Sequence, residues 1–248
     1  MTVQPQAPAG QPGRRLLSLV IPSLNEEDGI GAVLDEVPRQ ALAKEGWDVE
    51  VLVVDGESVD RTREIAKAKG ARVIVEPRKG YGRAYKTGFK HARGEVIATA
   101  DADLTYPVGD LPKFLHLLER ENLDFLTTDR FAELEDGAMR PKHKFGNWVL
   151  TTAAKLLFWR NIRDSQSGMW VFRRSVLDKL TLTADGMPFS EEIKVEAFRH
   201  PELKCREVPI RYRVRVGEVK LNSWSDGLEN LFFLLRKRFG FTRPEPDV

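Results

Sequence analysis

The first half of the chain repeats one pattern, in which a short apolar run is followed by a turn and a helix-like segment. Five runs have the length and composition of buried strands: residues 16–21, 49–54, 71–75, 95–100 and 124–128. Helical patterns separate them, near residues 30–37, 61–69, 82–92 and 110–121. Strands that alternate with helices form parallel βαβ units, because each helix returns the chain across the sheet. The sequence therefore predicts an α/β fold: an open, twisted, mostly parallel sheet with helices on both faces.

The domain organisation is expected to be simple. Residues 1–13 are rich in proline, glycine, glutamine and alanine, which predicts a disordered tail. Residues 14–240 contain no internal repeat and no clear linker, so we expect one domain there and a short tail at 241–248. The alternation is less regular in the second half, where three elements are expected: a helix near 145–159, a strand near 205–214 and an amphipathic helix near 225–238.

Composition excludes some classes of protein. The single cysteine, Cys205, rules out an internal disulfide and fits a reducing compartment. The longest apolar runs are much shorter than the roughly 18 residues that a membrane span needs. Residues 1–124 carry 17 basic and 20 acidic residues, a net charge of −3, whereas residues 125–248 carry 22 and 17, a net charge of +5. This asymmetry reflects either ordinary solvated faces or a second half that binds an anion or an anionic membrane.

Acidic residues follow three of the predicted strands. Glu26 comes after the first, Asp55 after the second, and Asp101 and Asp103 after the fourth. Ligands of open parallel sheets bind beyond the carboxyl ends of the strands, so these carboxylates are expected at one edge. Each acid taken singly could simply cap the next helix. Together they would repel one another unless a cation is present, and oxygen ligands of this kind suit Mg²⁺ or Mn²⁺ with substrate phosphates.

Two basic segments complement these acids. Residues 78–83 read Arg-Lys-Gly-Tyr-Gly-Arg, and the glycines would let backbone N–H groups approach an anion at a helix start. The spacing matches neither a dinucleotide-binding loop nor a P-loop. Residues 212–221 place arginines at alternate positions of a strand. Both segments also have a purely structural explanation: the first could be a surface turn, and the second could protect a sheet edge from pairing.

The ordered set of motifs resembles glycosyltransferase family 2, which has the GT-A fold. The segments that carry the resemblance are 21–27 (IPSLNEE), 53–58 (VVDGES), 80–82 (GYG) and 101–107 (DADLTYP). The later segments 163–168 (RDSQSG), 172–174 (FRR), 208–210 (VPI) and 215–221 (RVGEVKL) resemble the branch of dolichyl- and polyprenyl-phosphate mannose and glucose synthases. The resemblance covers roughly residues 16–235.

The resemblance implies roles for particular residues. It implies that Asp101 and Asp103 hold a divalent metal, Mg²⁺ or Mn²⁺, and that Asp101, Asp103, Arg130 and Arg215 act in catalysis. Seven positions would bind the nucleotide-sugar donor: Pro22, Glu26, Asp55, Gly80, Asp101, Arg215 and Lys220. Three would bind the acceptor phosphate: Arg130, Lys142 and Lys144. Glu192 is a candidate for the sugar pocket, or alternatively one of the acids that favour a helix N-terminus.

The implied activity is inverting transfer of a hexose from a GDP- or UDP-sugar to a polyprenyl phosphate. A phosphate monoester is largely a dianion at neutral pH, since its second pKa is about 6, so no catalytic base is assigned. The apolar helices near 145–159 and 225–238, with basic residues around them, are either core or contacts with a membrane surface. We expect a cytoplasmic protein, peripheral on the cytoplasmic face of the membrane, bound to lipid or to an integral membrane partner, with no nucleic-acid partner.

Two other functions are compatible with the sequence. A transferase of the same fold acting on a soluble or saccharide acceptor would need a carboxylate base beside the sugar. A non-catalytic module that binds anionic membranes would have no use for Asp101 and Asp103. A nucleotidyltransferase is disfavoured because no glycine-rich, basic loop follows the first strand.

Overall fold

The computed structural model describes residues 14–217 and 223–242. The expected disordered tail at 1–13 and most of the expected tail at 241–248 lie outside these residues, as does Lys220. The division into domains therefore stays a prediction.

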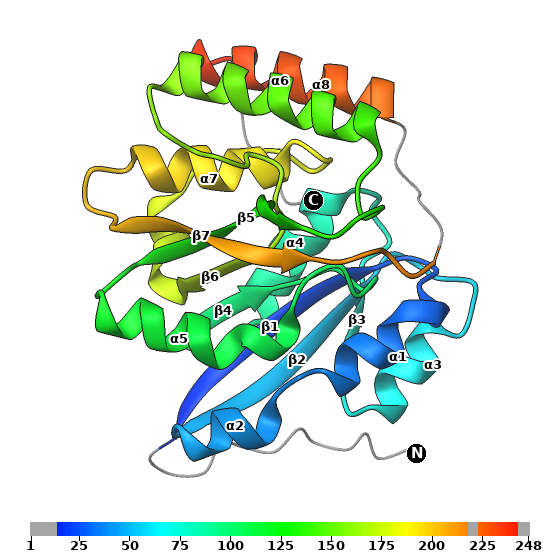
Figure 1. Cartoon of the computed structure of the whole chain (residues 1–248). Coiled ribbons are helices and arrows are strands. Elements are labelled where there is room, and N and C mark those ends of the chain that lie inside the picture. Colours follow the sequence, from blue (N-terminus) through cyan, green and yellow to red (C-terminus); the bar gives the residue numbers. More distant parts are fainter. Residues whose placement is uncertain (1–13, 218–222, 243–248) are drawn as a thin grey trace.

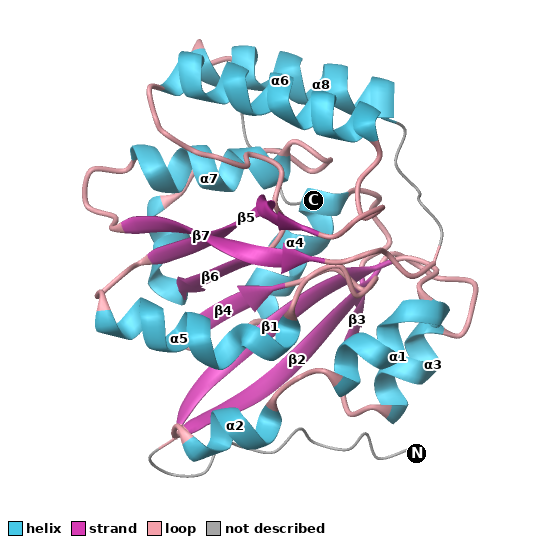
Figure 2. Ribbon diagram, viewed as in Figure 1, coloured by secondary structure: helices cyan, strands magenta, loops and turns pink. Residues whose placement is uncertain are grey.

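A seven-stranded sheet forms the centre of the protein, in the order β3-β2-β1-β4-β6-β5-β7 (Figures 1 and 2). Its strands are β1 (Arg15–Ser23), β2 (Trp47–Asp55), β3 (Arg72–Val75), β4 (Val96–Thr99), β5 (Phe125–Leu134), β6 (Trp170–Arg173) and β7 (Cys205–Tyr212). The pairs β1–β2, β1–β4, β2–β3 and β5–β7 are parallel, whereas β6 pairs antiparallel with both β4 and β5. This confirms the predicted α/β class with a mostly parallel sheet.

All six expected strands are present, and β6 is the strand that sequence patterning missed. Its four residues, Trp-Val-Phe-Arg, are too few to show a period, and the first three are completely buried. A short apolar run of this kind cannot be assigned from periodicity alone. β6 matters for the site because it lies between the strand that leads to the acidic turn and the strand that carries Arg130.

Helices cover both faces of the sheet. They are α1 (Glu27–Asp35), α2 (Arg39–Lys44), α3 (Thr62–Ala68), α4 (Tyr81–His91), α5 (Leu111–Arg120), α6 (Pro141–Phe158), α7 (Phe189–Arg199) and α8 (Ser223–Arg238), with short 3-10 helices at Val108–Asp110 and Arg174–Lys179. Helices α1, α2, α3 and α5 belong to one core, and α4 and α7 to the core on the opposite face.

The alternation of side chains along β1 explains the two cores. Leu17, Leu19 and Ile21 point to the side of α1 and α5, whereas Val20 points to the side of α4. Helix α5 buries Leu111, Phe114, Leu115 and Leu118 on one stripe. Each such side chain contributes about 1.5–3 kcal/mol when it is fully buried, so these stripes fix the helices against the sheet.

Helices α6 and α8 form a further layer outside α7 and lie side by side (Figure 1). Their inner faces share a small core with α7, made of Ala154, Phe158, Ile162, Val195 and Leu234. Both expected helices are thus present and are only half buried. None of the helices in the described part of the chain is long and apolar enough to cross a membrane.

Candidate active site

The turns after β1, β2 and β4 meet at one edge of the sheet, as the strand pattern predicts. The register pairs Ser23 with Asp55, the last residues of β1 and β2. Each turn holds one non-glycine residue in the left-handed region: Asn25 at φ 50°, Glu57 at φ 64° and Leu104 at φ 67°. Such backbone conformations cost free energy and cluster at functional sites, so they indicate that this edge of the sheet is the candidate active site.

Asp55 has a structural task within this edge. Its carboxylate is fully buried and accepts hydrogen bonds from the backbone N–H of Ser58 at 2.9 Å and from the Ser58 hydroxyl, with Arg63 3.5 Å away. These contacts hold the turn that follows β2 in place. Pro22 is the penultimate residue of neighbouring β1. Contact of Pro22 or Asp55 with a donor stays a prediction.

Asp101 and Asp103 follow β4. Asp103 is buried, and its Oδ1 accepts hydrogen bonds from the Thr105 N–H at 3.1 Å and the Thr105 hydroxyl at 2.6 Å. The Tyr81 hydroxyl donates to Asp101 at 3.3 Å. Burial, together with the nearby Asp103 carboxylate, raises the pKa of Asp101 to about 7. A buried carboxylate whose charged form is disfavoured by a second carboxylate nearby is the electrostatic setting that a divalent cation stabilises.

The residues present fit a magnesium or manganese ion only if other oxygen atoms complete its shell. Within residues 14–217 and 223–242, no cluster of three or more histidine, cysteine or acidic side chains could hold a metal ion. Mg²⁺ is typically bound by one or two carboxylates together with substrate phosphates and water. Asp101 and Asp103 would thus hold the ion jointly with a diphosphate.

Arg215 lies against this acidic edge. Its Nη2 donates to Glu26 at 2.7 Å, and its Nη1 is 3.2 Å from Asp103 Oδ2. The backbone N–H of Val216 donates to the Asp103 carbonyl at 3.0 Å, and Arg213 pairs with Glu36 at 2.6 Å. The segment after β7 is therefore tied across the acidic turn. The sequence predicted Arg215 at the donor diphosphate, which stays a prediction, and it did not single out these ion pairs of Arg215 and Arg213.

Gly80 is needed for close backbone packing. It has φ 138°, and a side-chain Cβ there would lie 2.3 Å from the Asp185 carbonyl oxygen. The next N–H groups of helix α4 are already donated, Gly82 to Gly186 at 3.2 Å and Arg83 to Asp185 at 2.9 Å. The expectation that these amides receive an anion does not fit this arrangement, and a donor contact at Gly80 stays a prediction.

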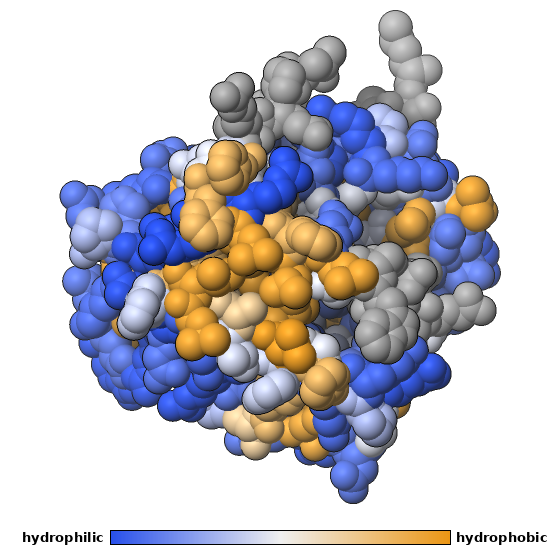
Figure 3. Space-filling model, turned by 90° about the horizontal axis from the view of Figure 1, so that it is seen from above, coloured by the Kyte–Doolittle hydropathy of each residue, from blue (hydrophilic) through white to orange (hydrophobic). Residues whose placement is uncertain are grey.

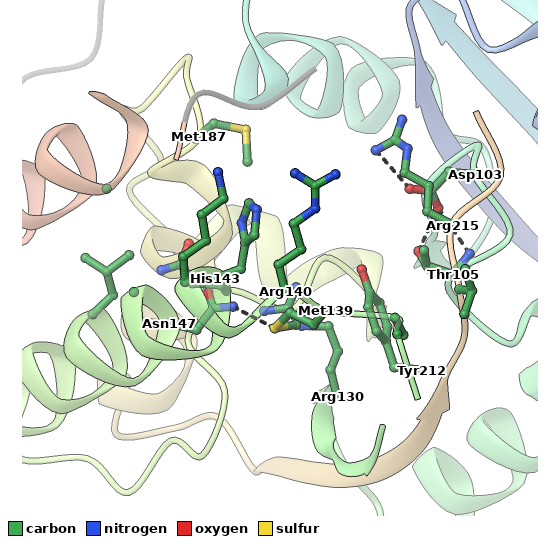
Figure 4. A pocket seen from close by; sticks show the side chains of 18 of the residues that line it. Asp103, Thr105, Arg130, Met139, Arg140, His143, Asn147, Met187, Tyr212 and Arg215 are labelled. Atoms are coloured by element: carbon green, nitrogen blue, oxygen red, sulfur yellow. Dashed lines mark hydrogen bonds and ion pairs between the residues drawn. The ribbon is translucent and has the colours of Figure 1, made fainter. Parts of the chain in front are cut away.

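A cleft of about 360 Å³ opens beside the acidic edge. Figure 4 shows Asp103 and Arg215 on one side of it and Arg140 and His143 on the other. Arg130 and Tyr212, from β5 and β7, also line the cleft. One cavity thus joins the Asp103 carboxylate and Arg215 at one end with a group of cations at the other.

Arg130 is held rigidly beneath this cleft. Nε and Nη2 donate to the two oxygens of Asp164 at 2.7 and 2.9 Å, and both side chains are buried. Burial alone lowers the pKa of an arginine, but the Asp164 carboxylate outweighs it and holds the pKa of Arg130 above its usual value. The same pairing lowers the pKa of Asp164 in spite of its burial. Both groups are therefore charged, and Arg130 presents a fixed positive charge.

The other cations of the cleft come from the start of α6. Lys142 lines the cleft, whereas Lys144 is exposed and is not among the described lining residues. The predicted contact of either lysine with an acceptor phosphate stays a prediction. Arg140 and His143, which sequence reasoning missed, line it instead. Burial and the charges of Lys142 and Arg140 lower the pKa of His143. The Arg-Pro pair at residues 140–141, typical of a helix start, was the signal that could have placed Arg140.

Glu192 does not fit the expected sugar pocket. It is fully buried in the first turn of α7, where its carboxylate accepts hydrogen bonds from the Thr183 and Ala184 N–H groups at 2.8–2.9 Å and pairs with Lys237 at 2.8 Å. These contacts fix α8 to α7. The alternative, an acid at a helix N-terminus, describes the position better.

Comparison with known proteins identifies the family. The model of glycosyl transferase family 2 matches residues 18–181. Low-salt glycan biosynthesis hexosyltransferase Agl6 of Haloferax volcanii is 38% identical over 232 residues, which are 93% of this chain and 55% of that protein. Dolichyl-phosphate hexose transferase of the same organism is 35% identical over 211 residues, 85% of this chain and 89% of that protein.

Dolichol-phosphate mannosyltransferase of Pyrococcus furiosus is 28% identical over 241 residues, 94% of this chain and 65% of that protein. The chain thus spans about half to nearly all of the length of these relatives. Among solved structures, glucosyl-3-phosphoglycerate synthase from Mycobacterium tuberculosis, in complex with Mn²⁺, UDP and glucosyl-3-phosphoglycerate, superposes with a TM-score of 0.72 at 22% identity, covering 92% of this chain and 81% of that one. That likeness shows the fold, and the sequence matches show that the chain belongs to glycosyl transferase family 2, in its polyprenyl-phosphate branch.

Proposed function

We propose that this protein is an inverting, metal-dependent hexosyltransferase that moves a hexose from a nucleotide diphosphate sugar to a polyprenyl phosphate. The observation that carries the proposal is the single cleft that joins Asp103 and Arg215 to Arg130 and Arg140. A transfer between two phosphate-bearing substrates needs both a place for a leaving diphosphate and a separate cationic place for an acceptor phosphate.

The donor would bind at the acidic end. Asp101 and Asp103 would hold Mg²⁺ or Mn²⁺ with the diphosphate, and the ion would neutralise the charge that develops on the departing nucleoside diphosphate. The synthase with the same fold was crystallised with Mn²⁺ and UDP, which supports a divalent ion here. Arg215 lies beside Asp103 and is placed to grip the same diphosphate.

The acceptor phosphate would bind at the cationic end. Arg130 uses its Nε–Nη2 edge for Asp164, so its other edge can meet a phosphate. Arg140, Lys142 and His143 surround the same space. A phosphate dianion is already a nucleophile, so the task of this end is to position it and balance its charge.

The lipid chain would lie along α6 and α8. Figure 3 shows apolar side chains gathered on the face that these helices form. Trp159 is 81% exposed, Trp148 62% and Phe232 62%. Exposed aromatic residues, together with basic residues such as Arg236 and Arg238 at the end of α8, are typical of helices that lie in a membrane interface. We infer a peripheral protein at the cytoplasmic face, held by lipid or by an integral membrane partner.

A transfer assay tests this function. The protein is incubated with Mn²⁺, farnesyl phosphate and either UDP-glucose or GDP-mannose, and the organic phase is analysed for a lipid-phosphate hexose by mass spectrometry. We expect this product with one of the two donors. Transfer of the hexose to free sugar acceptors without any lipid product would favour the soluble-acceptor alternative. Absence of both transfer and donor binding would favour the non-catalytic alternative.

A further inference from the structure

One cation of the protein already occupies the acidic edge. The Arg215 guanidinium bridges two carboxylates from different strand ends, Glu26 at 2.7 Å and Asp103 at 3.2 Å. All three side chains are largely buried, and Arg215 Nε is buried without a hydrogen-bond partner among the described residues. The opposite charges therefore attract across a poorly hydrated contact, where such attraction is stronger than in water.

The contact uses the oxygen that a metal ion would need. Oδ1 of Asp103 is taken by the N–H and the hydroxyl of Thr105. Oδ2 is the oxygen left for an incoming cation, and it is the one that faces Arg215 Nη1. A divalent ion at Asp101 and Asp103 would stand next to the guanidinium and be repelled by it unless the guanidinium turns away.

The backbone that carries Arg215 is anchored independently of this contact. The Val216 N–H holds the Asp103 carbonyl, and Arg213 holds Glu36 and the Tyr106 carbonyl. When a donor binds, therefore, only the side chain of Arg215 has to change its partner, and the backbone around it can stay in place. A diphosphate provides the new partner, because it offers two or more negative oxygens to a planar guanidinium.

We propose that the Arg215 guanidinium, through its contact with Asp103, competes with the metal ion for that carboxylate and thereby couples metal binding to donor binding. The guanidinium lowers the affinity of the site for a bare divalent ion. The diphosphate of the donor draws the guanidinium away from Asp103 and so frees that carboxylate for the ion. Each ligand then strengthens the binding of the other, and couplings of this kind are typically about 5–150-fold. This inference rests on the proposed function, since it takes the donor to be a nucleoside diphosphate sugar.

The test measures Mn²⁺ binding by isothermal titration calorimetry, first with no nucleotide and then with UDP or GDP, whichever supports transfer. In the wild type, nucleotide should tighten Mn²⁺ binding at least 5-fold. Arg215→Gln should bind Mn²⁺ alone at least 5-fold more tightly than the wild type, and nucleotide should add much less. A gain of affinity cannot result from misfolding, so the outcome is informative even for a less stable variant.

Two further variants sharpen the result. Glu26→Gln leaves Asp103 as the charged partner of Arg215 and should weaken binding of Mn²⁺ alone. Arg140→Gln removes the same charge from the other end of the cleft and should change Mn²⁺ affinity far less than Arg215→Gln. Unchanged or weaker Mn²⁺ binding in Arg215→Gln, with wild-type binding intact, would overturn this inference and leave the proposed function standing. No Mn²⁺ binding by the wild type even with nucleotide would overturn both.

Discussion

The Arg130 guanidinium is locked to the Asp164 carboxylate by two parallel hydrogen bonds, Nε to Oδ2 at 2.7 Å and Nη2 to Oδ1 at 2.9 Å. The backbone N–H of Arg130 donates to the same carboxylate at 3.1 Å. Asp164 lies 34 residues from Arg130 and is fully buried. The positive charge proposed for the acceptor phosphate is therefore built into the interior of the protein and does not depend on a mobile surface side chain.

Replacing Arg130 should weaken acceptor use selectively. Loss of a charge-assisted contact costs about 1.5–3 kcal/mol, so Arg130→Ala should raise the KM for the lipid phosphate by about 10-fold or more while the Kd for the donor stays near wild type. Since Asp164 would be left buried without its partner, we also expect a loss of stability of about 3–5 kcal/mol, measured by urea unfolding. Arg140→Ala is the matched exposed variant and should affect acceptor KM without that loss. Equal weakening of donor and acceptor in Arg130→Ala would contradict the assignment.

The metal proposal predicts that Asp101→Asn and Asp103→Asn abolish transfer. A chelator such as EDTA should do the same to the wild type, and added Mn²⁺ should restore it. Asp101→Asn should be at least as stable as the wild type in metal-free buffer, because burial and Asp103 already disfavour the charged form of Asp101. Thermal unfolding checks this point. Full transfer in the presence of chelator would contradict the proposed role of a metal ion.

A buried lysine gives a prediction about pH. Burial lowers the pKa of Lys194 to about 7 from its usual 10.5, although Asp164, Glu207 and Glu191 oppose the shift and Arg130 adds to it. Between pH 7 and 10.5 the unfolded chain therefore binds a proton that the native protein lacks, so this lysine makes stability rise with pH in that window, by at most about 1.4 kcal/mol per pH unit. Below pH 7, Lys194 is protonated in both states, and the full destabilisation caused by burying its charge is present.

The measurement compares wild type with Lys194→Met by urea unfolding at pH 6 to 10. Lys194→Met should gain most, relative to wild type, at low pH, and the difference should shrink as pH rises. Burial raises the pKa of Glu191 and Glu207, which gives a trend opposite to that of Lys194, and the Lys194 charge lowers both of these pKa values. The difference between the two proteins therefore contains Lys194 together with its coupling to these two acids. Lys90→Met, which removes an exposed lysine, is the control. A pH-independent difference for Lys194→Met would contradict the prediction.

The membrane proposal predicts binding to vesicles that contain an anionic lipid. Trp159→Ala with Phe232→Ala should reduce co-sedimentation, because Trp159, directly after α6, and Phe232, on α8, are both mostly exposed. Arg236→Gln and Arg238→Gln should weaken binding at low salt by about 1 kcal/mol each and matter little at high salt. Val75→Ala, an exposed apolar residue on the edge strand β3, is the control.

Comparing the transfer rates with a long and a short lipid acceptor separates loss of membrane docking from a structural effect of these substitutions. Turnover of a long polyprenyl phosphate in vesicles should fall in the α6–α8 variants, whereas turnover of farnesyl phosphate should stay near wild type. An equal loss with both acceptors would mean that these helices support the fold. Lys237 is excluded from the set, because the structure buries its ammonium against Glu192 and Glu196.

The amino-acid sequence by itself determined the parallel strands β1 to β4 and the carboxylates that follow β1, β2 and β4. Those features are local: apolar runs of strand length, helical spacing between them, and acids at fixed offsets from the strand ends. Parallel strands bring their carboxyl ends to one edge whatever the details of packing, so Asp55, Asp101 and Asp103 could be placed together from the pattern alone.

Tertiary structure alone decided which side chains face the cleft. Arg130 meets Asp164, Arg215 meets Glu26 and Glu192 meets Lys237 across separations of 34, 189 and 45 residues, and no local period records such pairings. Arg140 and His143 reach the cleft because α6 packs on α7 and α8 at that end of the sheet. Spacing along the chain specifies the face of an element, whereas the partners of a buried charge are fixed only when distant elements close around it and bring countercharges within reach.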